Sequence, residues 1–520
     1  MKHACLLLLS LCFASGAIPP AIAADAAPGT PARKPNFIII NIDDLGYADI
    51  GPFGSTNRTP HLDRMAKEGM KLTSHYAAPV CSPSRTALMT GCYPKRALPI
   101  PHVLFPAASV GLNPEEVTVA EVLKTAGYAT ACIGKWHLGD QKPFLPTNQG
   151  FDSYFGLPYS NDMGPGAEGA KSNPDKPLPA PPAGNNNPNP AKARNAPGDE
   201  TGIKGAGQPP LPLLENDKVI ARVRVEEQFA LTRQYTERAV KFIRSHKETP
   251  FFLYMPHTAV HFPLYPDRAA HMGKSPNGLL GDWAEEVDAS VGQILAAIRD
   301  LKLEKDTLVI FTSDNGGSVP HGSNNKPLRG SKASTWEGGI RVCTLAWWPG
   351  KVPAGQSTSA ITSMMDILPT LAHFSGAKLP AGRKLDGVDQ SALLTGASGD
   401  KPPRDHFFYF RGFTLDAVRQ GPWKLHLALP DGPPQKPTSP PRPQLFNLET
   451  DIGETRDVAA ANPEIVQRLQ DLATTMKDDL GLEGQGPGCR PLGRVENPQP
   501  FIGMDGTVRE DAAGSQKAFP

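Results

Sequence analysis

The sequence is short of three things: an excess of charge of one sign, cysteine, and long apolar runs. Its 53 lysines and arginines nearly balance 52 aspartates and glutamates, which leaves a formal net charge of +1. A balance this even gives no electrostatic reason to expect a nucleic acid or an anionic membrane as partner. Beyond the N-terminus no apolar run is long enough to cross a bilayer, so we expect no membrane span. The 520 residues suffice for one large domain with an appendage, or for two to three ordinary domains.

The one marked apolar run lies at the N-terminus. Lys2 supplies a basic start, the run extends from Ala4 to Phe13, and Ala21-Ile22-Ala23 follows as a small-residue pattern. This order is typical of a secretory signal peptide, whereas serines and prolines interrupt the span that a membrane anchor would need. We therefore predict that residues 1–23 are removed and that the protein is exported, either periplasmic or secreted. Cleavage would remove one base and no acid, leaving 52 of each.

Cysteine is scarce, with 7 residues in the chain, of which Cys5 and Cys12 belong to the predicted signal peptide. The five that remain are Cys81, Cys92, Cys132, Cys343 and Cys489. An odd number in an exported protein leaves at least one cysteine outside any disulfide, and Cys81 is the candidate. For the other four, two disulfides and buried free thiols are both open.

Four segments share a layout in which an apolar run ends on polar residues. They are NFIIINIDD, YATACIGKWH, FFLYMPHTAVH and TLVIFTSDN. Runs this uniformly apolar are typical of parallel strands that are buried on both faces. Helical patterns occur between them, at 59–69, 118–127 and 283–301. Strands alternating with helices predict an α/β fold.

The remaining segments differ from this strand–helix pattern in composition. Residues 164–212 are rich in Pro, Gly and Asn and are expected to form a long surface insertion. Residues 396–484 contain short alternating runs followed by an amphipathic helix, which predicts a smaller α+β domain. Residues 485–520 are expected to be an irregular tail.

The polar residues that end the four apolar runs are candidates for a site. They are Asp43 and Asp44, then Lys135 and His137, then His257 and His261, and last Asp314 and Asn315. Because ligands of such sheets bind beyond the carboxyl ends of the strands, we expect these residues to meet in one crevice. The aspartates and Asn315 offer only oxygen ligands, which suit Ca²⁺ or Mg²⁺ better than zinc. The alternative is that these acids only cap helices or turns.

The stretch CSPSRTALMTG, from Cys81 to Gly91, predicts a helix that begins at the cysteine. A thiolate nucleophile suits the N-terminal end of a helix, with Arg85 one turn later as a fixed positive charge. A thiol enzyme, however, does not need a hard cation with three carboxylates, or lysines and histidines at the same crevice. Cationic groups around a metal ion describe a site for a tetrahedral anion, which favours a sulfate or phosphate ester hydrolase.

These motifs resemble the type I sulfatases of the alkaline phosphatase superfamily. CSPSRTALMTG resembles the sulfatase signature, with Cys81, Pro83, Arg85, Thr90 and Gly91 at its characteristic places, and GKWHLG resembles the second family motif. The likeness extends over NIDDLGYADIG, FFLYMPHTAVHFP, TSDNGG, GSKASTWEGGIRV and QLFNLETDIGETRDVA.

The resemblance covers about residues 35–480 and favours the arylsulfatase and N-acetylgalactosamine-6-sulfatase members. It implies a catalytic domain over 35–395 with a large mixed, mostly parallel sheet flanked by helices. It also implies a C-terminal domain over 396–484 that is built on an antiparallel sheet.

The resemblance also implies a chemistry for Cys81. In this family a formylglycine-generating enzyme oxidises the first cysteine to Cα-formylglycine, whose aldehyde is hydrated to a geminal diol. One oxygen of the diol attacks sulfur, the alcohol leaves, and a covalent sulfo-enzyme intermediate remains. The second hydroxyl then expels sulfate and restores the aldehyde.

The matched motifs imply a role for each site residue. Ca²⁺, or Mg²⁺ in its place, would be bound by Asp43, Asp44, Cys81, Asp314 and Asn315. Arg85 would hold the diol, Lys135 would contact both the diol and the sulfate, and His137 would be the base that drives sulfate release. The leaving oxygen would face Lys332 and His261, with His257 as the alternative to His261. Ser160 matches a sulfate-binding position.

The sequence leaves the substrate open between an aryl sulfate and a sulfated saccharide, and it does not predict the oligomeric state. A phosphate or phosphonate monoester hydrolase is the alternative enzyme, although such sites often hold two metals and this sequence shows ligands for one. A protein whose Cys81 stays unmodified, and which only binds anions, is the alternative outside enzymes.

Overall fold

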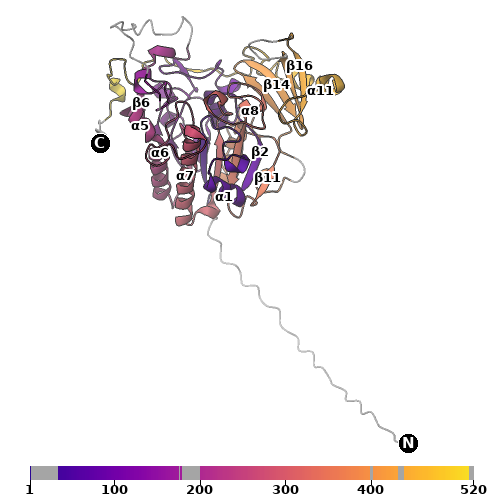
Figure 1. The fold of residues 1–520 in the computed structure, drawn as a ribbon, viewed down its shortest axis with the longest axis horizontal. Helices are drawn as coiled ribbons and strands as arrows, with labels where there is room; N and C mark the ends of the chain where they lie inside the picture. The colour runs from indigo at the N-terminus through magenta and orange to yellow at the C-terminus, as the bar shows by residue number, and fades with distance from the viewer. Residues whose placement is uncertain (2–32, 175, 179–199, 399–401, 431–437, 515–520) are drawn as a thin grey trace. The chain divides into compact units, whose positions relative to one another are not determined.

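A large mixed sheet forms the centre of the structure, which is a computed structural model (Figure 1). The structure describes residues 1, 33–174, 176–178, 200–398, 402–430 and 438–514, so the predicted signal peptide after Met1 lies outside the described residues. Within the described residues the strand order is β11-β2-β10-β9-β1-β8-β4-β5-β6-β7, and β12 also pairs with β2. The strands are β1 (Asn36–Ile42), β2 (Met70–Tyr76), β4 (Ala129–Ile133), β5 (Ser153–Gly156), β6 (Leu211–Glu215), β7 (Lys218–Val223), β8 (Phe251–Pro256), β9 (Thr307–Ser313), β10 (Arg341–Trp347), β11 (Gln356–Thr358) and β12 (Thr362–Ser363).

The four strands predicted from apolar runs are neighbours in this sheet. In the order β9-β1-β8-β4 each pairs with the next in parallel, and Ile39 lies opposite both Tyr254 and Ile310. Their carboxyl ends therefore lie at one edge of the sheet. The outer strands β10 and β6 are antiparallel to their inner neighbours β9 and β5. The predicted mixed, mostly parallel α/β sheet is confirmed.

Helices cover both faces of the sheet because alternate residues of β1 point to opposite sides. Ile38 and Ile40 belong to a core cluster shared with α1 (Pro60–Glu68), α6 (Leu231–Ser245) and α7 (Gly278–Asp300). Phe37 and Ile39 belong to a cluster shared with α2 (Cys81–Thr90), α4 (Val119–Thr125) and α9 (Ile367–Ser375). Both faces of the strand are thus buried, which explains its unbroken apolar run.

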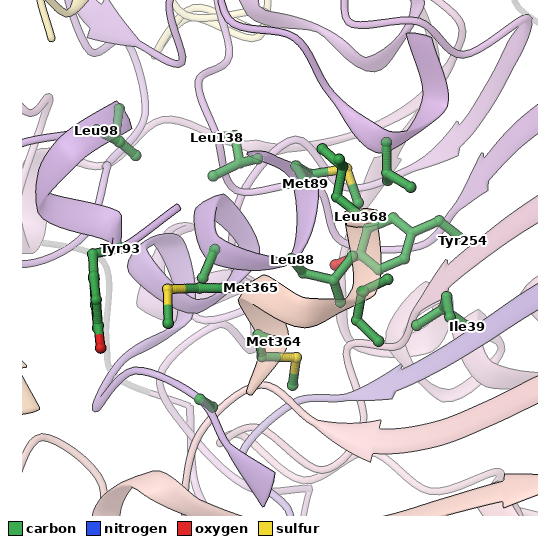
Figure 2. Close-up of a cluster of buried hydrophobic side chains, with 14 of the residues drawn as sticks. Ile39, Leu88, Met89, Tyr93, Leu98, Leu138, Tyr254, Met364, Met365 and Leu368 are labelled. Atoms are coloured by element: carbon green, nitrogen blue, oxygen red, sulfur yellow. The ribbon is translucent and has the colours of Figure 1, made fainter. Parts of the chain in front are cut away.

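Helix α2 begins at Cys81 and is fixed by this second core cluster. Leu88 and Met89 of α2 pack near Met364 and Leu368 (Figure 2). The helix ends at Gly91, whose φ of 66° is a left-handed conformation that favours glycine, and the Gly91 N–H donates to the Ala87 carbonyl at 3.0 Å. A buried helix with a fixed end holds its first residue in a defined place.

The segment 164–212 differs from the expected surface insertion at its end, since Leu211 and Pro212 already belong to β6. β6 and β7 form an antiparallel hairpin that extends the sheet, and Leu211 and Leu213 are buried. Of the β6 residues, only Leu214 and Glu215 pair with β5, so Pro212, which has no N–H to donate, lies outside that ladder. Residues 175 and 179–199 of the segment lie outside the described residues.

A second sheet, with order β13-β14-β15-β16, is antiparallel throughout, as predicted for the C-terminal region. Its strands are β13 (His406–Arg411), β14 (Thr414–Gln420), β15 (Trp423–Leu429) and β16 (Arg442–Asn447), and α11 (Pro463–Thr474) packs on β14 and β15 (Figure 1). In the tail, β17 (Gly493–Arg494) pairs with β3 (Val110–Gly111), and Phe501 is buried. The short helices are α3 (Pro94–Ala97), α5 (Val225–Phe229), α8 (Glu337–Ile340) and α10 (Ser391–Leu394).

Two expectations concern the described residues as a whole. None of the described helices is both long and apolar enough to cross a membrane. The five cysteines after the signal peptide, Cys81, Cys92, Cys132, Cys343 and Cys489, are all free thiols. The structure therefore has free thiols, buried except for the partly exposed Cys489, and not the two disulfides that the sequence left open.

Candidate active site

The loop after β1 carries Asp43 and Asp44 to the carboxyl edge of the sheet. The Asp43 N–H donates to the Ala259 carbonyl at 2.8 Å, and the Val260 N–H donates to the Asp43 carbonyl at 2.7 Å. These two bonds tie the loop after β1 to the loop after β8. Both carboxylates are buried, so each needs a partner.

Cys81 lies against this loop from the first position of α2. Its Sγ donates to Asp43 Oδ1 at 3.4 Å. Burial raises the pKa of the Cys81 thiol well above its usual value, and the carboxylates of Asp314 and Asp43 raise it further, against Lys135 and Lys332. A thiolate at the helix terminus, which the sequence suggested as one reading, is therefore disfavoured, because two carboxylates and burial outweigh the cations.

Arg85 lies one turn further along α2 and holds two carboxylates at once. Its Nε and Nη2 donate to Asp314 Oδ2 at 3.1 and 2.7 Å, and Nη2 also reaches Asp43 Oδ2 at 3.2 Å. Its Nη1 donates to the Lys135 carbonyl. The guanidinium is fully buried, so its charge acts with little screening from water.

Lys135 and Ser160 come from the loops after β4 and β5. Lys135 Nζ pairs with Asp43 Oδ2 and donates to Ser160 Oγ at 3.2 Å. Burial alone would raise the pKa of Asp43, but Lys135, His261 and Arg85 outweigh burial and hold it well below its usual range. Asp43 is thus an ionised carboxylate between two fixed cations.

His137 follows Lys135 in a left-handed conformation with φ of 65°. Its Nε2 is 2.8 Å from the Leu104 carbonyl, which can only accept, so Nε2 carries the proton in the neutral ring. Burial lowers the pKa of His137 well below its usual value, with Lys135 and Arg85 adding to the effect. Its Nδ1 is buried and has no partner among the described residues, which leaves one free lone pair.

Lys332 lies on the loop between β9 and β10 and pairs with Asp44 at 2.8 Å. Both sides of this loop are held by Glu454, whose carbonyl accepts from Arg329 Nη1 at 2.8 Å and whose carboxylate accepts from the Glu337 N–H at 2.7 Å. Lys424 of β15 in turn pairs with Glu337 and with Glu454, each at 2.9 Å. The C-terminal sheet thereby fixes the loop that carries Lys332.

The structure separates the two histidines that follow β8. His261 Nε2 lies 3.7 Å from Asp44 Oδ2, and its Nδ1 lies 3.3 Å from Ser160 Oγ. His257 packs edge-on against Tyr235, and neither of its ring nitrogens has a hydrogen-bond partner in the described part of the chain. Burial lowers the pKa of His257 to about 3. Of the two, His261 has the contacts of a site residue and His257 has those of a core residue.

Asp314 and Asn315 lie directly after β9. Asp314 Oδ1 accepts from the Asp44 N–H at 3.3 Å, while Oδ2 is taken by Arg85. Burial and the nearby charge of Asp43 raise the pKa of Asp314 to about 6. Asn315 Nδ2 donates to Asp44 Oδ1 at 2.8 Å, and Asn315 Oδ1 is buried without a partner in the part of the chain that the structure describes.

These residues fit a hard cation. One candidate ligand atom from each of Asp43, Asp44, Cys81 and His261 lies within 4.8 Å of the others. The free Oδ1 of Asn315 adds a neutral oxygen of the kind that Ca²⁺ binds. The carboxylate of Asp314, predicted as a ligand, is engaged here by Arg85 and Asp44.

The site contains equal numbers of negative and positive side chains. Three carboxylates face three cations, which are Arg85, Lys135 and Lys332. These six groups therefore sum to about zero, and a divalent cation bound among them would add two positive charges, which favours an anionic substrate. An anion would thus bind where the metal ion and the cations meet.

Sequence reasoning missed several charged or aromatic residues around the site. Asp162 is close enough for the charges of His261, Lys135 and Lys332 to act on it. The charges of Asp44 and Lys332 act on the pKa of His321, which burial lowers. The His321 ring stacks on Phe262 with centroids 4.5 Å apart. The available signal for Asp162 was its place in the PYSND stretch, two residues after Ser160. No comparable pattern marks His321.

Comparisons with known proteins find sulfatases. The family model described as Sulfatase matches residues 35–377, and the one described as the C-terminal region of aryl-sulfatase matches residues 402–484. Steryl-sulfatase of Mus musculus is 37% identical over 506 residues, covering 84% of this chain and 80% of that protein. Arylsulfatase A of Homo sapiens is 37% identical over 475 residues, covering 85% of this chain and 87% of that protein. The solved structure of the PsFucS1 sulfatase from Pseudoalteromonas sp. has a TM-score of 0.72 at 27% identity, covering 89% of this chain and 92% of that one.

Proposed function

The chain belongs to the sulfatase family, and from this premise we propose that it hydrolyses sulfate monoesters, either aryl sulfates or sulfated saccharides. The observation that carries the proposal is the contact between Cys81 and Asp43, inside a buried cluster of three carboxylates and three cations. A nucleophile at position 81 would face an anion held by Lys135 and Lys332.

Position 81 is proposed to carry Cα-formylglycine, made from Cys81 by a formylglycine-generating enzyme. The hydrated aldehyde would supply a nucleophile that takes up the sulfo group and a second hydroxyl that releases it. Two features of this chain support the modification. The thiol itself is a poor nucleophile here because its pKa is raised, and Arg85 lies one turn away on the same helix to hold the oxygens of the diol.

One Ca²⁺ ion, or Mg²⁺ in its place, is proposed to bind to Asp43, Asp44, Asp314, Asn315 and the group at position 81. The ion would act as a Lewis acid on the oxygens of the nucleophile and of the sulfate. Asn315 is the residue that argues most directly for it, since its buried Oδ1 would otherwise have no partner.

Proton transfer is assigned to the two histidines of the site. The neutral His137 ring, with its free Nδ1 lone pair, is proposed as the base that drives release of sulfate. His261 Nδ1 is 2.5 Å from the Phe262 carbonyl, which can only accept, so Nδ1 carries a proton. Nε2 would face the leaving oxygen as general acid when the ring is doubly protonated, next to the Asp44 carboxylate. Lys332 would stabilise the negative charge on that oxygen.

The experiment compares 4-nitrophenyl sulfate with 4-nitrophenyl phosphate and a phosphonate monoester. Protein from the native host should hydrolyse the sulfate ester best, and its Cys81 peptide should be about 18 Da lighter than the thiol form, since sulfur is replaced by oxygen with loss of two hydrogens. Cys81→Ala should abolish hydrolysis, and Cys92→Ala serves as the matched control. A preference for phosphate or phosphonate, or a peptide that carries only thiol in active protein, would refute the proposal. The predicted export, to the periplasm or the medium, is tested by sequencing the N-terminus of the same preparation.

A further inference from the structure

The side chains of the site differ in how far solvent reaches them. Those of Arg85, Lys135 and Asp43 are 0% exposed. That of Lys332 is 19% exposed and that of His261 is 11% exposed. Within the part of the chain that the structure describes, the site therefore meets solvent beside Lys332 and His261. These two residues are proposed to face the leaving oxygen, so the alcohol portion of the ester would extend toward solvent on this side.

His321 is tied to this opening through the loop that carries Lys332. The Val319 N–H donates to Ser331 Oγ at 3.1 Å, and Ser331 directly precedes Lys332 in the chain. The short 3-10 helix that ends at His321 therefore lies beside the segment that carries the exposed ammonium group. His321 Nδ1 lies 3.0 Å from Ser318 Oγ, a contact that fixes the orientation of the ring.

The segment after β8 reaches His321 from the other side of the opening. The His321 ring stacks on the Phe262 ring, with centroids 4.5 Å apart and an angle of 18° between the ring planes. Phe262 directly follows His261, and its carbonyl lies 2.5 Å from His261 Nδ1. The stacked pair thus joins the two segments between which the site meets solvent. The charges of Asp44 and Lys332, which act on the pKa of His321, agree with this position.

The stacked pair presents ring surface to solvent at this opening. His321 is exposed, Phe262 is half-buried, and Val319, at the start of the same 3-10 helix, is 49% exposed. Because stacking on Phe262 covers one face of the His321 ring, the exposed surface of His321 comprises the other face and the ring edges. Such a surface favours a second flat ring, which stacks on it and removes apolar area from water.

We propose that His321, supported by Phe262, is a specificity-determining residue that stacks on a ring in the alcohol portion of the ester. This inference rests on the proposed sulfatase function. The recognised chemistry is the flat, apolar face of a ring, which an aryl ester and the pyranose of a sulfated saccharide both offer. Esters of short acyclic alcohols have no such face. Since the stacked ring neither forms nor breaks a bond, the contact contributes mainly to binding and hence to KM.

The test compares His321→Ala and His321→Phe with the control His246→Ala. The His246 ring also lies against a phenylalanine, Phe242, with centroids 4.2 Å apart, but it directly follows α6 and precedes β8, at the opposite edge of the sheet. His321→Ala should raise KM for 4-nitrophenyl sulfate about 5-fold and change kcat less than about 2-fold, as expected when an aromatic contact is lost. His321→Phe should keep KM within about 2-fold of the wild-type value, because a flat ring is retained. His246→Ala should change neither constant.

Inorganic sulfate separates the ring contact from the anion site. Sulfate has no ring, so its inhibition constant should be the same in His321→Ala as in the wild-type protein. A parallel series with N-acetylgalactosamine 6-sulfate distinguishes the two sources of the ring, since the substrate with the larger rise in KM is the one that stacks better.

Three results would overturn the inference. They are an unchanged KM for both substrates in His321→Ala, a loss of kcat without a rise in KM, and sulfate inhibition that weakens as much as KM rises. Failure of the proposed sulfatase function looks different, because the wild-type protein would then hydrolyse neither substrate, and the inference would fall with it.

Discussion

Replacing Arg85 with lysine keeps the charge at the centre of the site and removes only its shape. Arg85 makes two hydrogen bonds to Asp314, one to Asp43 and one to the Lys135 carbonyl, and it is fully buried. A lysine ammonium is a single point of charge and cannot span these acceptors. If two charge-assisted bonds are lost, at about 1.5–3 kcal/mol each, the free energy of unfolding should fall by at least about 3 kcal/mol.

The assay is urea unfolding of the mature protein, with Arg64→Lys as the matched control. Arg64 pairs with Glu68 at 2.6 Å on the surface of α1, where its side chain is 56% exposed. The same substitution there should cost less than about 0.5 kcal/mol, because exposed ion pairs contribute little. Arg85→Lys should also lower kcat/KM for 4-nitrophenyl sulfate about 100-fold or more, as expected when a fixed donor is lost from the site. An Arg85→Lys protein within 1 kcal/mol of Arg64→Lys and of similar activity would refute this account of the buried network.

Three further predictions follow from other parts of the structure. Adding Ca²⁺ to chelator-treated protein should raise its thermal midpoint, by the equivalent of about 2.7 kcal/mol when the free Ca²⁺ concentration is 100 times Kd. Asn315→Ala should weaken this gain, because it removes a proposed oxygen ligand. A midpoint that does not change with calcium would contradict the proposed metal site. His261→Ala should lower kcat for the aryl ester about 100-fold, which is within the range for loss of a general acid. His257→Phe should leave kcat nearly unchanged, because His257 has only core contacts. Equal losses in the two variants would contradict the assignment. Burial raises the pKa of Glu286 to about 8 in the folded protein, above its unfolded value, so the stability this group contributes is complete below the unfolded pKa and is lost as pH rises through about 8. Glu286→Gln should therefore raise the thermal midpoint more at pH 9 than at pH 5, and equal shifts at both would contradict the sign.

The central strands and the convergence at their ends could be predicted because burial on both faces leaves a plain signal. β1, β4, β8 and β9 are unbroken apolar runs, and the parallel arrangement that buries them also brings their polar ends to one edge. The hairpin of β6 and β7 gave no such signal. β6 begins inside a stretch rich in proline and glycine, and only the pairing with β7 makes Leu211 and Pro212 part of a sheet.

The sequence favoured His261 over His257 only through the family resemblance, and the contacts that distinguish the two lay beyond it. Both follow β8, and their difference depends on how the loop returns toward Asp43, through the hydrogen bonds of Ala259 and Val260. The missing partner of Asn315 Oδ1 could not be foreseen either, because an unsatisfied oxygen is a property of packing. Residue types suggested the chemistry proposed for the site, and long-range contacts show which copies of each type lie together at the ends of the strands.

Glu454 contacts both sides of the loop that carries Lys332, and this constrains which C-terminal segments the catalytic domain could accept. A C-terminal segment exchanged with that of a distant relative would have to supply an acid at this same point. Without it the anchor at the Glu337 N–H would be lost, whereas the carbonyl that accepts from Arg329 could come from any residue. The loop that carries Lys332, which is proposed to stabilise the leaving oxygen, would then be held less firmly. The smaller sheet can therefore influence the proposed chemistry through the loop that carries Lys332.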